Sequence, residues 1–136
     1  MQFRKMLAEL EKLNLAKDQY AIFGSGPMAI RGIRDAEDID LIVTPGLWKK
    51  LCKKYKADKN ERGTERIKIG EIEIYKEWMP VFEGLDKVIS DSEMIEGYPF
   101  VKLDHVIMWK RKFGREKDKK DIGMIERFLR EERFSC

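Results

Sequence analysis

Residues 20–43 constrain the fold more than any other part of the chain, because two short apolar runs there are separated by a glycine turn and about a dozen residues. The first run, residues 20–23 (YAIF), is typical of a buried strand, and it stops at the turn formed by residues 24–26 (GSG). Residues 26–37 can form a short helix, and residues 37–43 (EDIDLIV) have the pattern of a second strand. This segment therefore predicts strand, glycine turn, helix and strand in succession.

The rest of the chain alternates between helical and strand patterns and then ends in helices. We predict helices over residues 3–15, 47–55 and 85–96, one bulged or two short strands over 66–75 closed by Trp78, Met79 and Pro80, and helices over about 102–113 and 115–132. This order indicates an α/β (α+β) fold, in which a small mixed β-sheet has helices packed on it and is followed by C-terminal helices. We expect a single domain over residues 1–136, with a core of about 18–80 and a C-terminal helical part of about 84–133.

The composition is that of a globular chain, with 43% hydrophobic and 39% charged residues. No stretch approaches the length of about 20 apolar residues that a membrane span needs, and acidic residues near the N-terminus argue against a signal peptide. Cys52 and Cys136 lie too far apart in sequence to suggest a metal-binding motif. We expect a cytoplasmic protein without a membrane partner, and the scarcity of amide side chains favours a thermophilic source.

Two aspartates in the second strand are the first candidates for a functional site. Side chains alternate across a strand. Asp38, Asp40 and Ile42 therefore share one face, and the other face carries Ile39, Leu41 and Val43. Two carboxylates close together in an apolar setting repel each other unless a cation lies between them. Mg²⁺, or Mn²⁺ in its place, prefers such oxygen ligands together with substrate phosphates.

The GSG turn is the second candidate. Gly24 and Gly26 permit a tight turn, and N–H groups at the start of the following helix could face an anion, with the Ser25 hydroxyl beside them. The turn matches neither the GxxxxGK[ST] loop nor the GxGxxG fingerprint. Taken alone, such a turn is usually an ordinary connection between two elements.

A third acid is expected on a later strand. In residues 71–75 (EIEIY), Glu71 and Glu73 fall on one face, and Ile72 and Ile74 on the other. Glu73 is our choice because isoleucines flank it as they flank Asp40, and Glu71 is the alternative nearer the solvent. An ordinary polar strand face explains either residue equally well.

Together these residues resemble the core signature of the nucleotidyltransferases related to DNA polymerase beta. That family has a Gly-Ser or Gly-Gly pair, a gap of about a dozen residues, an Asp-x-Asp pair and a third acid, matched here by Gly24, Ser25, Asp38, Asp40 and Glu73. Residues 31–43 (RGIRDAEDIDLIV) are similar to the version in small toxin and antitoxin nucleotidyltransferases, with Arg34 at the arginine position and Ala36 in place of threonine. The resemblance implies that the three acids hold the metal and act in catalysis, and that Gly24, Ser25 and Arg34 bind the nucleotide.

Residues 110–122 (KRKFGREKDKKDI) resemble a segment that follows the core in the abortive-infection type of these enzymes. By that resemblance Lys110 would hold the triphosphate, and Asp118 would orient the lysine or contact the nucleotide. An interhelical network of salt bridges among Lys110, Arg115, Asp118 and Asp121 is the open alternative.

The resemblance predicts an enzyme that transfers a nucleoside monophosphate from an NTP to a hydroxyl of a protein, a tRNA or a small molecule, with Mg²⁺ or Mn²⁺. The chain would act as a monomer or homodimer, with a toxin, an acceptor protein or tRNA as partner. An inactive binding module of the same fold, such as an antitoxin, is the main alternative. A nucleic-acid binder that uses the basic stretches 49–59 and 110–120 is another, although solvated helix faces explain these lysines first.

Three aromatic residues and the single histidine have simpler interpretations. We expect Trp78, Trp109 and Tyr98 to be core anchors rather than platforms for stacking bases. We expect His105 to be a surface or interhelical residue, because the sequence shows no catalytic partner for it.

Overall fold

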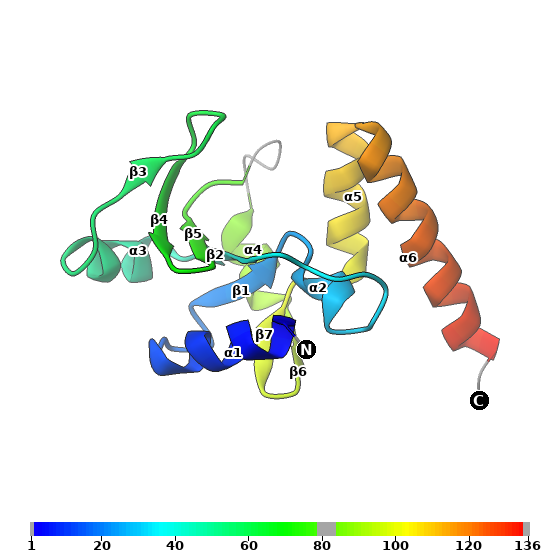
Figure 1. The fold of residues 1–136 in the computed structure, drawn as a ribbon, viewed down its shortest axis with the longest axis horizontal. Helices are drawn as coiled ribbons and strands as arrows, with labels where there is room; N and C mark the ends of the chain where they lie inside the picture. The colour runs from blue at the N-terminus through cyan, green and yellow to red at the C-terminus, as the bar shows by residue number, and fades with distance from the viewer. Residues whose placement is uncertain (1, 79–83, 135–136) are drawn as a thin grey trace.

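The computed structural model describes residues 2–78 and 84–134, and Figure 1 shows how their helices and strands are arranged. In chain order the elements are α1 (Gln2–Lys12), β1 (Tyr20–Phe23), α2 (Gly26–Ala29), β2 (Ile39–Val43), α3 (Pro45–Cys52), β3 (Asp58–Lys59), β4 (Glu65–Ile69), β5 (Ile72–Tyr75), α4 (Leu85–Ser90), β6 (Glu93–Ile95), β7 (Tyr98–Phe100), α5 (Leu103–Phe113) and α6 (Glu116–Phe134). Met79 and Pro80, which were expected to close the strands, and Cys136 lie outside the described residues.

The described strands form one seven-stranded mixed sheet in the order β3-β4-β5-β2-β1-β7-β6. Strand β2 runs antiparallel to β1 and parallel to β5, and β1 runs parallel to β7. The mixed sheet with helices packed on it confirms the predicted α+β class.

The two faces of the sheet carry separate hydrophobic cores because the strand side chains alternate. Leu41, Ile74 and their same-face neighbours pack with α1 and α3. Ala21, Phe23 and Ile42 point to the opposite face and pack with residues of α2, α4, α5 and α6. The predicted division of β2, with Ile39, Leu41 and Val43 on one face and Ile42 on the other, is confirmed.

The predicted helix over residues 85–96 is confirmed only for its first six residues, Leu85–Ser90, and is wrong for the rest. Helix α4 ends at Ser90, and the chain continues into a hairpin in which Ile95 pairs with Tyr98. Glu96 and Gly97 form the turn with φ angles of 53° and 89°. Two successive residues with positive φ suit the tight turn of a two-residue hairpin, and the helical spacing of apolar residues concealed this turn.

Residues 26–37 also differ from the expected helix, because α2 covers only Gly26–Ala29. Gly32 has a φ of 73°, which a continuing helix cannot accommodate, and the remaining residues form turns and a loop that leads to β2. The other predicted elements agree more closely with the structure. Helices are present in 3–15, 102–113 and 115–132, and two strands in 66–75, with bounds shifted by a few residues. Gly114, with a φ of 69°, ends α5 where the break between the two last helices was predicted.

Helices α5 and α6 pack side by side and stand next to the end of the sheet where β1 and β2 meet the α2 turn (Figure 1). This position brings residues of α5 and α6 to the same end of the central strands as Asp38 and the GSG turn. Within the described residues, no helix combines the length and the apolar character that a membrane crossing requires.

Candidate metal centre and cavity

Asp38, Asp40 and Glu73 come together near the N-terminal ends of the central strands β2 and β5, as the sequence predicted. Asp40 and Glu73 are direct neighbours in the parallel pairing of β2 with β5, and Asp38 lies just before β2 on the same face as Asp40. One carboxylate oxygen from each residue lies within 4.8 Å of the others. Hard oxygen donors at this separation suit a divalent ion such as Mg²⁺, so the three side chains could hold a metal.

The electrostatics of the two aspartates also fit a cation. Burial raises the pKa of Asp38 to about 6, and the negative charge of Glu73 adds to the effect. Burial raises the pKa of Asp40 well above its ordinary value, with further contributions from Asp38 and Glu73. A divalent cation would remove this penalty, because it stabilises the ionised form of each carboxylate.

Gly24 lies directly against Asp40. Phe23, which precedes the glycine, pairs with Asp40 across β1 and β2, and Gly24 then turns away with a φ of 61°. A Cβ at Gly24 would lie 2.4 Å from Oδ2 of Asp40. The first glycine of the GSG turn is therefore needed for both its backbone angle and the space that the aspartate occupies.

Glu73 is held by two donors from its own hairpin. The Tyr75 hydroxyl donates to Oε1 of Glu73 over 2.7 Å, and Nη1 of Arg66 donates to the same oxygen over 2.9 Å. The second carboxylate oxygen takes no bond from either donor. Glu71 is exposed in the turn before β5 and lies outside the cluster. Of the two glutamates that the sequence offered, Glu73 is therefore the one that joins the two aspartates.

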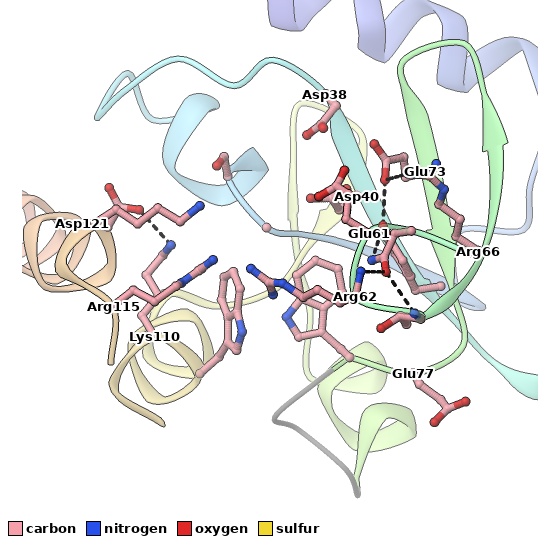
Figure 2. A pocket seen from close by; sticks show the side chains of 18 of the residues that line it. Asp38, Asp40, Glu61, Arg62, Arg66, Glu73, Glu77, Lys110, Arg115 and Asp121 are labelled. Carbon is pink, nitrogen blue, oxygen red and sulfur yellow. Dashed lines mark hydrogen bonds and ion pairs between the residues drawn. The ribbon is translucent and has the colours of Figure 1, made fainter. Parts of the chain in front are cut away.

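A cavity of about 310 Å³ opens beside the three acids (Figure 2). One side carries Asp38, Asp40 and Glu73, and Lys110 and Arg115 lie on the side formed by α5 and α6. Indole rings form part of the wall: Trp78 stacks on Phe23 with ring centres 4.8 Å apart, and Trp109 meets Trp78 edge to face at 5.2 Å. The expectation that Trp78 and Trp109 are core anchors is thus incomplete, because both rings also line the cavity.

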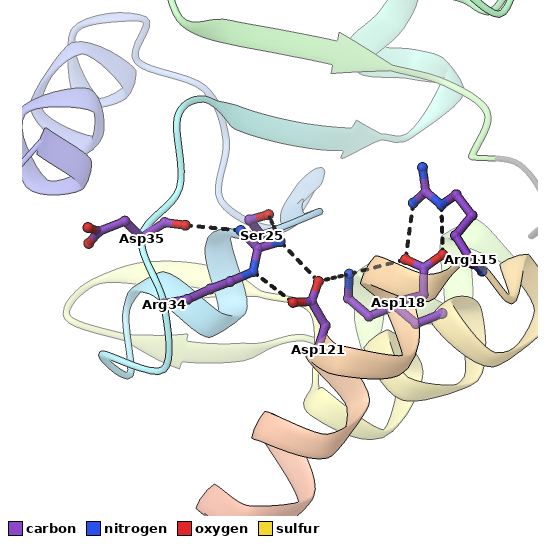
Figure 3. Close-up of polar contacts among 7 residues, drawn as sticks. Ser25, Arg34, Asp35, Arg115, Asp118 and Asp121 are labelled. Carbon is purple, nitrogen blue, oxygen red and sulfur yellow. Dashed lines mark hydrogen bonds and ion pairs between the residues drawn. The ribbon is translucent and has the colours of Figure 1, made fainter.

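Ser25 and Arg34 join the GSG turn to the last helix (Figure 3). Nη2 of Arg34 donates to Oγ of Ser25 over 2.8 Å, and the same guanidinium forms two bonds to the Asp121 carboxylate of 2.9 and 3.0 Å. Arg34 and Ser25 both line the cavity. Arg34 therefore links the GSG turn to Asp121 of α6.

Lys110 and Asp118 are buried in the charge network that the sequence offered as an alternative. The Lys110 side chain is 3% exposed and donates to Oδ2 of Asp121 over 2.8 Å, while Oδ1 of Asp118 lies 3.7 Å from the amine. Arg115 binds Asp118 through two side-chain bonds of 2.7 and 3.1 Å. Lys110 lies in the cavity wall, and its predicted contact with a triphosphate stays a prediction.

Burial opposes the ionisation of Asp121, yet the bonds from Arg34 and Lys110 outweigh it and lower the pKa of this carboxyl. Asp118 behaves similarly, because the bonds from Arg115 outweigh its burial and lower its pKa. The two acids therefore stay ionised, and each neutralises a cation inside the helix pair.

Sequence reasoning missed Arg66, Tyr75 and Arg62 as part of this cavity. Tyr75 lies two positions after Glu73 and so shares its strand face, which is a signal that could have identified it. The place of Arg66 in the cavity follows from the pairing of β4 with β5. The place of Arg62 follows from the path of the loop between β3 and β4, where the sequence pattern indicates only a polar loop.

The remaining residues singled out in the sequence lie away from the cavity. His105 is half-buried, with Nε2 3.2 Å from Oδ2 of Asp91, as expected of an interhelical or surface residue. Tyr98 donates to the Leu7 carbonyl over 3.3 Å, in agreement with a core anchor. Lys49, Lys50, Lys53 and Lys54 are exposed, which agrees with a solvated helix face.

Comparison with known proteins does not assign a family. No model of a known protein family matches the chain, and a search of curated proteins finds no match.

Proposed function

We propose that the chain is a minimal nucleotidyltransferase that transfers a nucleoside monophosphate from an NTP to an acceptor hydroxyl with the help of Mg²⁺. The observation that carries the proposal is the cluster of Asp38, Asp40 and Glu73, with oxygens within 4.8 Å of one another at the edge of a cavity. The resemblance of the Gly-Ser and Asp-x-Asp pairs to the polymerase beta superfamily supports the same function. The acceptor would be a protein side chain, a tRNA end or a small molecule.

In the proposed reaction, the oxygen of the acceptor hydroxyl forms a bond to the α-phosphorus of the NTP. The bond from that phosphorus to the oxygen bridging the β-phosphate breaks, and pyrophosphate leaves with the electron pair. A bound Mg²⁺ would offset the phosphate charge and polarise the oxygens that it contacts.

The side chains of this protein would then supply position and proton transfer. Asp38 and Asp40 provide oxygen ligands from one strand, so their spacing is fixed by the β2 backbone. Glu73 takes the proton of the acceptor hydroxyl, and the bonds from Tyr75 and Arg66 to its Oε1 hold the carboxylate in one orientation.

One observation favours the alternative of a binding module without catalysis. Arg66 forms an ion pair with Glu73, which reduces the negative charge available to a metal. Such a module would bind its partner whether or not the aspartates are intact, whereas an enzyme would need both.

The two functions are separated by measuring NTP binding and transfer. The protein is incubated with each NTP labelled at the α-phosphate, with Mg²⁺, and with RNA or protein acceptors. We expect Mg²⁺-dependent binding and transfer of label, both lost in the Asp38→Ala, Asp40→Ala double variant, with Glu71→Gln as a control that retains them. Binding unchanged in the double variant would exclude the proposal, and binding to RNA that weakens steeply with salt but ignores the aspartates would indicate a nucleic-acid binder.

A further inference from the structure

We propose that Arg62, in the loop between β3 and β4, is the residue that binds phosphate in the cavity. The inference rests on the proposed function, because it assigns the group that would hold the triphosphate of the NTP opposite the carboxylates. Neither the Gly-Ser and Asp-x-Asp pairs nor the C-terminal segment points to this residue.

The other arginines and the buried lysine of the cavity already have carboxylate partners. These pairs are Arg34 with Asp121, Arg66 with Glu73 and Asp58, Lys110 with Asp121, and Arg115 with Asp118. Within the part of the chain that the structure describes, the Arg62 side chain pairs with no carboxylate, and it lines the cavity. Lys117, in the first turn of α6, shares this property, and both side chains are exposed.

Arg62 differs from Lys117 because an aromatic ring orients it. The centre of its guanidinium lies 4.4 Å from the centre of the Phe113 ring, and the guanidinium of Arg115 lies 3.8 Å from the same ring. Stacking restrains the guanidinium plane while its N–H groups stay free to donate. An arginine held in this way suits bidentate binding of phosphate oxygens.

The loop that carries Arg62 is fixed to the third acid by a chain of hydrogen bonds. Oδ1 of Asn60 accepts bonds of 2.9 Å from the backbone N–H groups of Arg62 and Thr64. Nδ2 of Asn60 donates to the Tyr75 hydroxyl over 3.4 Å, and this hydroxyl in turn donates to Glu73. The position of Arg62 is therefore coupled to that of the acid that would act in the reaction.

The position of Arg62 also suits a ligand that spans the cavity. Figure 2 shows its side chain between Asp38, Asp40 and Glu73 on one side and Lys110 and Arg115 on the other. A polyphosphate that contacts a cation at the acids would extend toward this unpaired guanidinium. The chemistry of the site thus points to a phosphate chain rather than to a single carboxylate.

Calorimetric titration with inorganic tripolyphosphate in the presence of Mg²⁺ tests the assignment without reference to the base or the acceptor. We expect Arg62→Ala to weaken tripolyphosphate binding by about tenfold or more, since a hydrogen bond to a charged group is lost. Arg62→Lys should recover part of the affinity because it keeps the charge. Arg111→Ala is the matched control, because Arg111 is an exposed arginine of α5 that pairs with Glu126 and lies outside the cavity lining.

The titrations separate a failure of this inference from a failure of the proposed function. If the unaltered protein binds tripolyphosphate and NTP but Arg62→Ala binds them equally well, the assignment of Arg62 is wrong and the function stands. If the unaltered protein binds NTP but not tripolyphosphate, the assignment is wrong as well. If it binds neither, both proposals are wrong.

Discussion

A Cβ atom added to Gly24 would lie 2.4 Å from Oδ2 of Asp40, so the glycine turn and the acidic strand are in direct contact. The contact follows from the antiparallel pairing of β1 with β2, in which Phe23 lies opposite Asp40. The two parts of the sequence motif are therefore one structural unit, in which the turn leaves room for the carboxylate.

Replacing Gly24 with alanine should destabilise the protein and weaken metal binding. The left-handed backbone at Gly24 costs an alanine about 1–2 kcal/mol, and the displaced Asp40 adds to this loss. Gly32→Ala is the matched control, because Gly32 has a φ of 73° and no neighbour within 4 Å of the added Cβ. We expect chemical denaturation to show the greater loss for Gly24→Ala, and calorimetry to show weaker Mg²⁺ binding for that variant alone. Equal effects of the two variants would contradict a specific contact with Asp40.

Replacing Asp40 with asparagine should stabilise the protein without metal and remove the stabilisation by Mg²⁺. Burial and the charges of Asp38 and Glu73 raise the pKa of Asp40, so its ionised form is unfavourable in the folded state. We expect Asp40→Asn to raise the melting temperature in chelator and to abolish the increase that Mg²⁺ causes. Glu71→Gln removes an exposed acid near the cluster and should leave the Mg²⁺ effect intact. A melting temperature of Asp40→Asn that still rises with Mg²⁺ would count against the metal centre.

The stability of the metal-free protein should fall as the pH rises from about 4 to 6. The pKa of Asp38 is raised from 3.8 to about 6, so the folded state binds more protons than the unfolded state in this window. Stability from Asp38 is thus full below pH 4 and lost above pH 6, and after allowance for solvent screening we expect a change on the order of 1 kcal/mol. Denaturation of the protein and of Asp38→Asn across this range measures the effect, which should be smaller in the variant. The same pH profile in both proteins would show that Asp38 is not the source.

Replacing Asp121 with alanine should destabilise the protein by about 3 kcal/mol, since it leaves the buried amine of Lys110 without its nearest partner. Arg34→Met should cost less, because the Arg34 side chain is 36% exposed and can reach water. Combining Asp121→Leu with Lys110→Met should recover part of the loss, because the pair is then removed together. Urea denaturation of the three variants measures these differences. A loss from Arg34→Met as large as that from Asp121→Ala would contradict this account of the network.

Substitution of Tyr75 by phenylalanine should weaken Mg²⁺ binding by about tenfold, as the loss of a group that orients a metal ligand commonly does. The ring contact with Trp78, at 5.4 Å between ring centres, is retained, and only the hydroxyl that donates to Glu73 is removed. Tyr55→Phe is a suitable control on the other face of the sheet, where Tyr55 packs against the core that contains α1 and α3. Unchanged Mg²⁺ affinity in Tyr75→Phe would show that Arg66 alone suffices to hold Glu73.

Local sequence pattern was enough to predict most of the elements and the three acids. Alternation of side chains placed Asp38 and Asp40 on one face of their strand, and Glu71 and Glu73 on one face of a later strand, because the period of a strand depends only on the backbone. Apolar spacing also located α1, α3, α5 and α6 to within a few residues. The hairpin of β6 and β7 escaped detection because the apolar residues of β6 continue the helical spacing of α4. The pairing of β7 with β1 and with β6 places these residues in the sheet.

The tertiary structure alone determined how these parts meet. The register that sets Asp40 beside Glu73, the contact of Gly24 with Asp40, and the arrival of Asp121 at Arg34 join residues far apart in the chain. Such contacts depend on strand order and helix packing, which the spacing of residues along the sequence does not encode. The sequence by itself identified the carboxylates and the glycine turn as candidates, because strand alternation and turn chemistry are local. The sheet register and the packing of α5 and α6 decided which side chains share the cavity, and they added Arg62, Arg66 and Tyr75 to it.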